Sequence, residues 1–297
     1  MGGGAGSASG WADGPAGWVA WLARVLDVGA FDRLIDDAAM LSPDTPSADE
    51  AVAAHRDHRA APYGDLIGPL VVSDQNLAQV GRACGAAPLE VIVAISGGAG
   101  GLLAVARRDI AGVEVVGVES VLRDLDDLAG NAARVAAAAE QLSDEVGVFV
   151  QFPYAHGWID AVEEIEAAGL LGAIWAGGSD PAHPPTASQL AEQLSALVEA
   201  DLPFKLTGSL RRAWPTAAGH GFLTVMLALE ALIDGADTGD AADLLRLDDQ
   251  QRIRNAFATW NDATVSRVRR RLRSIDCDAV RGAVADLRSL DLIAGAS

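Results

Sequence analysis

Short apolar runs alternate with helical patterns along this chain after residue 66, and this alternation leaves few folds open. Each run is rich in β-branched and aliphatic residues, and a helical pattern separates it from the next. Continuous apolar strands joined by crossover helices are typical of a parallel sheet covered on both faces. The six clearest runs are Leu70–Ser73, Val91–Ser96, Val115–Ser120, Gly147–Pro153, Leu171–Ala176 and Pro203–Thr207.

The number and spacing of these units favour a closed barrel. Six units follow one another at intervals of about 20–30 residues, which suits a (β/α)8 TIM-like barrel better than an open doubly wound sheet. Two later segments are ambiguous. Phe222–Leu229 fits either a seventh strand or a buried helix, and Ser274–Asp278 is a short, irregular last strand that would close the barrel.

The remaining parts of the chain are expected to lie around the barrel. Residues 1–12 are Gly/Ser-rich and predict a disordered tail. Residues 13–62 predict a helical segment packed on the barrel, with one or two amphipathic helices in Gly17–Met40 and a capping box formed by Ser47 and Glu50. Residues 63–297 are predicted to form the barrel domain with its C-terminal helices.

Composition excludes several classes of partner. A net charge of -19 disfavours nucleic acid and anionic membrane surfaces, because both require basic patches. The chain has no uninterrupted apolar run of transmembrane length, and it does not begin with the basic region of a signal peptide. Cys84 and Cys277 fit neither a disulfide framework nor a metal site. We therefore expect a cytoplasmic protein.

Lys205 is the only lysine in the chain, since one of the 22 Lys+Arg residues is lysine and 21 are arginine. A lysine amine can become neutral once burial lowers its pKa, and it can then attack a carbonyl to form a Schiff base. Arginine stays protonated and cannot form a Schiff base. A single retained lysine therefore indicates a position where a functional amine is needed and arginine cannot replace it. The structural alternatives are a lysine that extends to water from a strand end, or chance in a lysine-poor composition.

In a barrel, the residues at the carboxyl ends of the strands build the active site. Lys205 lies in the sixth predicted strand, and its Lys-x-Thr-Gly sequence is similar to the lysine motif of deoxyribose-phosphate aldolase, whose architecture places the Schiff-base lysine on the sixth strand. Glu119 ends another strand and is the best candidate for a buried carboxylate. His220 stands between two glycines and is a candidate acid/base, although a hydrogen-bonded residue at the start of a helix explains it equally well.

Backbone N–H groups in the late turns, together with an arginine, are candidates for holding an anion. Ordinary βα turns with surface arginines are the alternative. Gly97–Gly101 does not match a dinucleotide fingerprint, and a simple glycine turn is favoured there. No histidine pattern suggests a metal, so neither a metal nor a cofactor is assigned. The predicted substrate-binding residues are Gly177, Gly178, Thr207, Gly208, Ser209 and Arg212.

Several short stretches together resemble a bacterial protein family that is common in actinobacteria and has no established activity. The resemblance implies a barrel-like α/β fold. The chain departs from the family pattern at three places. Ala173, Trp175 and Ala176 stand where the family has Lys, Arg and Thr, Arg211-Arg212 stand in place of a His-His pair, and Thr224 stands in place of an asparagine. Two cations and a pair of potential bases are therefore missing. The matching stretches are Asp36–Ala39, Ala51–Arg59, Gly68–Val72, Pro203–Thr207, His220–Leu223 and Asp286–Leu292.

These observations predict a lyase- or aldolase-like enzyme that acts on a small anionic carbonyl compound. Lys205 would be the Schiff-base or acid/base lysine, and Glu119 and His220 would assist proton transfer. The alternative is a non-catalytic barrel that binds a ligand or a protein partner, including a second copy of itself, through its N-terminal helices or its arginine-rich helix at 250–273. A buried lysine facing an open cavity would favour the enzyme, and a lysine capped by carboxylates would favour the scaffold.

Overall fold

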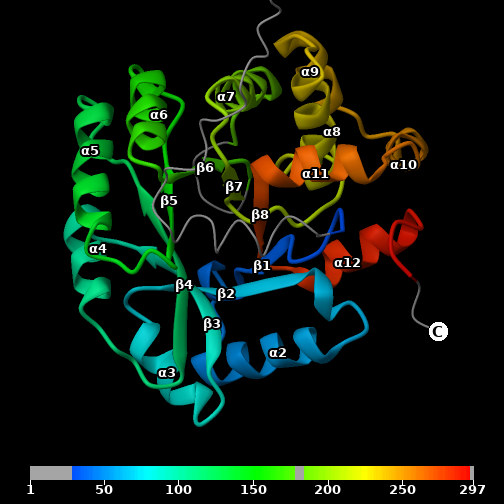
Figure 1. Ribbon diagram of the computed structural model, residues 1–297. Coiled ribbons are helices and arrows are strands. Elements are labelled where there is room, and N and C mark those ends of the chain that lie inside the picture. The colour runs from blue at the N-terminus through cyan, green and yellow to red at the C-terminus, as the bar shows by residue number, and fades with distance from the viewer. Residues whose placement is uncertain (1–28, 178–183, 295–297) are drawn as a thin grey trace, which may run out of the picture.

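The computed structural model describes residues 29–177 and 184–294, and within them the chain forms a closed barrel of parallel strands (Figure 1). The strands pair in sequence order, and the last pairs with the first, so the predicted (β/α)8 barrel is confirmed. The strands are β1 (Ile35–Asp37), β2 (Ile67–Ser73), β3 (Leu89–Ile95), β4 (Val113–Val121), β5 (Gly147–Gln151), β6 (Leu171–Trp175), β7 (Phe204–Thr207) and β8 (Leu272–Cys277).

Helices surround the barrel and connect its strands (Figure 1). The Ser47–Glu50 capping box opens the first of them as predicted, and the ambiguous run after residue 222 is a helix that is buried almost throughout. The helices are α2 (Ala48–Ala60), α3 (Leu77–Cys84), α4 (Gly98–Ala106), α5 (Leu128–Ala139), α6 (Trp158–Ala167), α7 (Ala187–Glu199), α8 (Phe222–Ile233), α9 (Thr238–Leu245), α10 (Gln250–Phe257), α11 (Asp262–Arg271) and α12 (Val280–Ser289), with the short 3-10 helices η1 (Ala39–Leu41) and η2 (Gly64–Leu66).

The first strand corrects the sequence prediction. Ile35–Asp37 was expected to be helical, but it forms β1, pairs with β2 and β8, and is buried at all three positions. Two of its three residues are aspartates, so the segment lacks the apolar pattern by which a strand is recognised. Their burial is accompanied by ionic contacts rather than by apolar packing. The barrel therefore begins inside the segment at 13–62, and Lys205 lies on the seventh strand, not the sixth. The predictions for residues 1–12 and for the start of the first helix lie outside the described residues.

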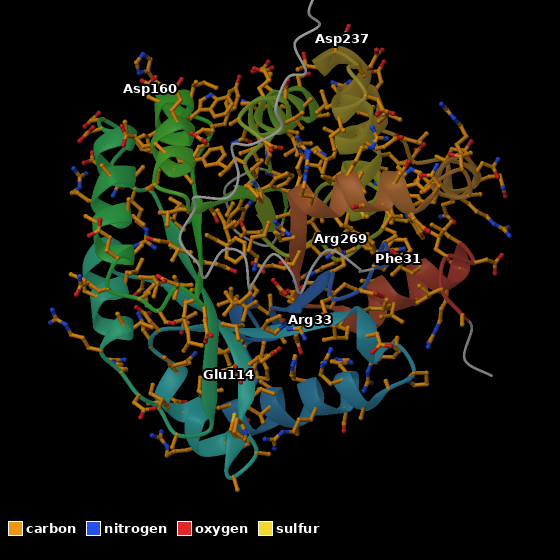
Figure 2. All side chains as sticks on the ribbon, in the orientation of Figure 1. Phe31, Arg33, Glu114, Asp160, Asp237 and Arg269 are labelled. Atoms are coloured by element: carbon orange, nitrogen blue, oxygen red, sulfur yellow. The ribbon has the colours of Figure 1, made fainter. Side chains whose placement is uncertain are left out.

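The apolar core lies mainly between the strands and the helices. Inside the barrel, Phe149, Leu171 and Ala173 form a separate small cluster, which leaves interior positions to polar side chains. Charged residues such as Asp160 and Asp237 lie on the periphery (Figure 2). Arg269 is an exception: it is buried beside β8, where its guanidinium donates hydrogen bonds to the carbonyls of Ala30, Asp32 and Arg273.

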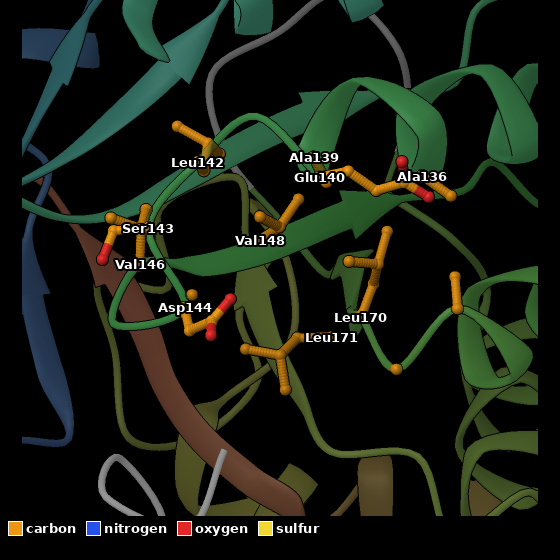
Figure 3. A pocket seen from close by; sticks show the side chains of 13 residues that line it. Ala136, Ala139, Glu140, Leu142, Ser143, Asp144, Val146, Val148, Leu170 and Leu171 are labelled. Atoms are coloured by element: carbon orange, nitrogen blue, oxygen red, sulfur yellow. The ribbon is translucent and has the colours of Figure 1, made fainter. Parts of the chain in front are cut away.

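A pocket of about 200 Å³ opens at the amino-terminal ends of β5 and β6 (Figure 3). Its apolar lining includes Leu142, Val148 and Leu171, and the carboxylates of Glu140 and Asp144 stand beside it. In barrels of this type the amino-terminal face serves stability, and chemistry takes place at the opposite face.

No described helix is both long enough and apolar enough to cross a membrane.

Candidate functional site

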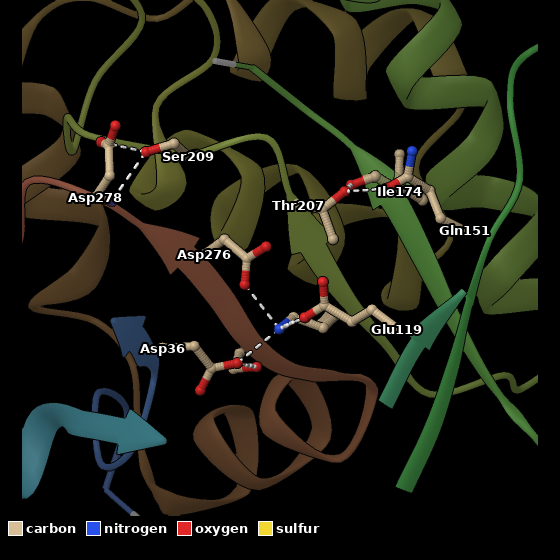
Figure 4. A network of polar contacts seen from close by, with 10 residues as sticks. Asp36, Glu119, Gln151, Ile174, Thr207, Ser209, Asp276 and Asp278 are labelled. Carbon is tan, nitrogen blue, oxygen red and sulfur yellow. Dashed lines mark hydrogen bonds and ion pairs between the residues drawn. The ribbon is translucent and has the colours of Figure 1, made fainter. Parts of the chain in front are cut away.

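Three carboxylates converge on the side-chain amine of Lys205 inside the barrel (Figure 4). The Nζ atom lies 2.8 Å from Oδ2 of Asp36 and 2.7 Å from Oδ1 of Asp276, and it donates a hydrogen bond to Oε1 of Glu119. The four residues come from β7, β1, β8 and β4. We call them the Lys205 cluster.

The strand alternation explains why these side chains meet. Successive residues of a strand point to opposite faces, so Lys205 points into the barrel while its neighbours Phe204 and Leu206 pack in the outer core. Asp36 and Asp276 are register partners on adjacent strands. Ala173, the register partner of Lys205 on β6, is small and leaves room for the long lysine side chain. The ring of Phe149 covers the ammonium, with its centroid 5.5 Å from Nζ.

The amine of Lys205 is held in its charged form. Burial alone would lower the pKa of this group, but the charges of Asp276, Asp36 and Glu119 outweigh burial and raise the pKa well above the usual lysine value. The side chain is 0% exposed, whereas Glu119 retains 8%. The resting site therefore contains a fully enclosed ammonium, and Glu119 is the member of the cluster that reaches solvent.

Asp276 behaves differently from an ordinary aspartate. Burial raises its pKa well above the usual value, and the nearby charge of Glu119 adds to that effect, while Lys205 opposes it. Asp276 therefore holds its proton more tightly than an ordinary aspartate does, next to the ammonium of Lys205. A buried group that holds a proton beside a carboxylate is suited to acid–base exchange.

Neighbouring hydrogen bonds fix β1 in place. Ser274 on β8 donates its hydroxyl to Oδ2 of Asp36. Asp37 points to the other face of the strand, where its Oδ2 lies 3.0 Å from Nδ1 of the buried His55 on α2. Oδ1 of Asp37 accepts a hydrogen bond from the backbone N–H of Ala39. Asp36 therefore bonds within the Lys205 cluster and to Ser274, and Asp37 bonds to His55 of α2 and to the backbone that follows β1.

A second polar layer lies at the carboxyl ends of the strands, beyond the cluster. The hydroxyl of Thr207 donates to Oε1 of Gln151 at 2.7 Å, which links β7 to β5 across β6 (Figure 4). Gly208 follows with a φ of +88°, and a Cβ atom there would lie 1.9 Å from the carbonyl oxygen of Gly177. A glycine at position 208 is therefore a requirement of this close approach.

His220 is not brought into contact with the Lys205 cluster. Its Nε2 lies 2.7 Å from the carbonyl oxygen of Pro185, in the connection that leads to α7. Burial lowers its pKa, and the hydrogen bond to Pro185 partly opposes this. These contacts match the structural reading of His220, as a hydrogen-bonded residue before α8. Its role as an acid/base stays a prediction.

The predicted anion-binding residues have partners of their own. Ser209 donates a hydrogen bond to the carboxylate of Asp278, which also binds Arg211. Arg212 makes a bidentate pair with Asp286 on α12, with its Nε 2.8 Å from Oδ2. The guanidinium lies over the ring of Trp214. Gly178 lies outside the described residues. An anion at this point would compete with carboxylates already in place.

Sequence reasoning singled out Lys205 and Glu119, which the structure brings into contact, but missed the two aspartates that complete the cluster. Asp36 was assigned to a helix, and Asp276 was placed in a closing strand without a role. The available signal was weak in both cases: each aspartate directly follows a buried isoleucine, Ile35 or Ile275, in a short segment.

Comparison with known proteins adds little beyond the architecture. No protein-family model matches the chain, and no curated protein matches it. One similar solved structure is 2,3-dimethylmalate lyase, a PEP mutase/isocitrate lyase superfamily member, with 13% identity over 93% of this chain and 89% of that one and a TM-score of 0.41. Another is a Rhizobium etli pyruvate carboxylase variant with acetyl coenzyme-A, with 13% identity over 86% of this chain and 25% of that one and a TM-score of 0.38. Neither likeness bears on activity, and the barrel assignment rests on the strand order itself.

The raised pKa of Asp276 predicts a pH-dependent stability difference. The unfolded chain loses this proton near the ordinary aspartate pKa, whereas the folded chain keeps it until a much higher pH. The contribution of Asp276 is therefore present at acidic pH and is lost as pH rises from about 4 towards its folded pKa. Compared with Asp276→Asn, the wild type should lose about 1.4 kcal/mol per pH unit in that window.

Urea unfolding of both proteins at pH 5.5, 7 and 8.5 measures this difference. Loss of the contact with Lys205 shifts the variant by a constant amount, so the slope is the diagnostic quantity. A difference between the two proteins that stays constant with pH would show that Asp276 is ionised in the folded state.

Proposed function

We propose that this barrel is a lyase-type enzyme that acts on a small carbonyl compound by moving a proton through the Lys205 cluster. The observation that carries the proposal is that Glu119, an acid–base group with 8% of its side chain exposed, contacts an enclosed ammonium that two further carboxyl groups hold. Side chains of a barrel interior are normally branched and apolar, and the barrel does not need charges there. Buried ionic groups contribute little to stability compared with apolar packing, so such a cluster points to chemistry.

The roles proposed for the residues of the Lys205 cluster follow from how far each side chain is exposed to solvent. Glu119 retains access to solvent, so it is the group that would touch the substrate and take a proton from the carbon beside the carbonyl. Lys205 donates a hydrogen bond to Glu119 and is the positioning residue that orients this carboxylate, and Glu119 itself returns the proton. Removal of that proton generates an enolate, the intermediate shared by aldol cleavage and related carbon–carbon lyase reactions.

The Schiff-base role of Lys205 stays a prediction, and the resting geometry counts against it. A Schiff base requires a neutral amine, and the three carboxylates hold Lys205 as an ammonium. The amine would become nucleophilic only after it passes a proton to Glu119 or Asp36, and the substrate would have to displace one of these contacts. The acid–base form of the proposal needs neither change.

Hydrogen–deuterium exchange at carbon tests the proposed proton transfer. The protein is incubated in D₂O with a panel of small aldehydes, ketones and keto acids, and loss of the α-proton signal is followed by NMR. Glu119→Gln should reduce the exchange rate by about 100-fold or more, because it removes the base. Glu114→Gln changes an exposed residue at the start of the same strand and serves as the matched control.

Borohydride trapping on the same panel decides between the two roles of Lys205. With one lysine in the chain, an adduct falls on Lys205 or on the N-terminal amine. An adduct at Lys205 that is absent from Lys205→Arg would establish the Schiff-base form. Exchange without an adduct is the result that the acid–base form predicts.

Lys205 is capped by carboxylates and completely enclosed, which is the arrangement expected for the second candidate function, a barrel that binds a ligand or partner without catalysis. In that case the Lys205 cluster only holds β1, β4, β7 and β8 together. The absence of both exchange and adducts across the panel would refute the proposed enzyme and leave this second candidate.

A further inference from the structure

An unpaired hydrogen-bond donor lies in the layer beyond the Lys205 cluster. Trp175 is the last residue of β6, two residues after Ala173, and therefore lies on the same face of the strand as that interior residue. Its indole Nε1 is buried and has no hydrogen-bond partner among the described residues. Buried donors without partners are rare in folded proteins, so this one can take an acceptor that the described residues do not supply.

The surroundings of the indole place this donor edge at the carboxyl end of the barrel. A Cβ atom on Gly208 would lie 3.0 Å from Cε2 of Trp175, the ring carbon bonded to Nε1. The glycine therefore gives the N–H edge of the ring its space. Trp175 is also the register partner of Thr207, two residues beyond Lys205 on the neighbouring strand.

A second donor group lies on the adjacent strand. Oε1 of Gln151 accepts the Thr207 hydroxyl at 2.7 Å, which orients the amide. Its NH₂ group has no hydrogen-bond partner in the part of the chain that the structure describes. Gln151 and Lys205 are both register partners of Ala173, so the amide and the ammonium lie on either side of the same small residue.

The charges nearby decide which acceptor fits. The Lys205 cluster sets three carboxyl groups against one ammonium, so it stays negative even with Asp276 neutral. Arg211 and Arg212 are paired with Asp278 and Asp286. An anion would meet repulsion from the cluster, whereas an uncharged oxygen would accept hydrogen bonds from neutral donors at little electrostatic cost.

We propose that Trp175 and Gln151 are ligand-binding residues that donate N–H hydrogen bonds to oxygen atoms of an uncharged carbonyl or hydroxy compound. The inference rests on the proposed function for the location of the reacting groups and names the substrate class. It replaces the anionic substrate expected from the sequence with an uncharged one.

Hydroxyacetone and pyruvate are a matched pair of probes, because a hydroxymethyl group in one stands where the other has a carboxylate. The chain has seven tryptophans, and the indole N–H signal of Trp175 in a ¹⁵N spectrum is the one that disappears in Trp175→Phe. Hydroxyacetone should shift this signal at a concentration about tenfold lower than pyruvate. Binding to the variants is followed through the side-chain amide signal of Gln151, which both variants keep. Trp175→Phe should bind hydroxyacetone about tenfold more weakly, the effect of about one hydrogen bond, and Trp260→Phe, a change beside Phe257, should bind it as the wild type does.

The same titration on Glu119→Gln separates this inference from the proposed function. That variant lacks the proposed base but keeps both donors, so the Trp175 signal should still move. A Trp175 signal that stays in place throughout both titrations, or one that responds at lower concentration to pyruvate, would overturn the inference whatever the outcome of the exchange experiment.

Discussion

Replacing Lys205 by methionine should lower the free energy of unfolding by about 3–5 kcal/mol, because it leaves Asp36, Glu119 and Asp276 facing one another without a cation. Methionine keeps the length and apolar stem of the side chain, so the loss reports the charge and not a cavity. Urea unfolding followed by circular dichroism measures the change.

Two further variants establish the origin of that loss. Arg254→Met breaks the exposed pair with Asp291 and should cost less than about 1 kcal/mol. Adding Asp36→Asn and Glu119→Gln to Lys205→Met should recover part of the stability, since the repelling charges are then gone. An unchanged midpoint in Lys205→Met, or no recovery in the combined variant, would mean that the carboxylates do not depend on the ammonium.

Gly208→Ala should prevent the native barrel end from forming and cost more than about 3 kcal/mol. Two effects act together: a φ of +88° strains any residue with a Cβ atom, and that atom would lie 1.9 Å from the Gly177 carbonyl oxygen. The obstacle is backbone, so no rotamer change relieves it. Thermal unfolding and the yield of folded protein are the measurements.

Gly235→Ala is the control for Gly208→Ala, because it has nearly the same φ, +92°, with no atom within 4 Å of the added Cβ. It should cost only the strain of the left-handed conformation, about 1–2 kcal/mol. Equal losses at the two positions would show that the close approach of Gly208 to Gly177 is absent in solution.

The architecture could be predicted from the sequence because most strands are continuous apolar runs. β2 through β7 each contain a run of buried residues, and such runs stand out against the helical patterns between them. β8 was recognisable only as a candidate, since Arg273 and Asp276 interrupt it. β1 was missed because two of its three residues are aspartates. The residue that compensates the charge of Asp36 lies far away in the sequence, so neighbouring residues give little indication that this aspartate is buried.

The same limit applied to the site. Lys205 and Glu119 were predictable because each is a polar residue inside or at the end of an apolar run. Their partners depend on barrel closure, which brings Asp36 next to Asp276 over 240 residues of sequence separation (276 − 36). The loops were less predictable still: Arg212 turns to Asp286 and His220 to Pro185, and neither partner is implied by neighbouring residues.

The state of the single lysine amine is the most direct test of the account. With ¹⁵N-labelled lysine the protein has one side-chain signal, that of Lys205 Nζ. We predict an ammonium signal that is protected from exchange with water and persists above the ordinary lysine pKa of 10.5, since the three carboxylates raise the pKa of this group. A signal that titrates near neutral pH, or one that exchanges as fast as an exposed lysine, would contradict the enclosed ammonium on which the proposed chemistry rests.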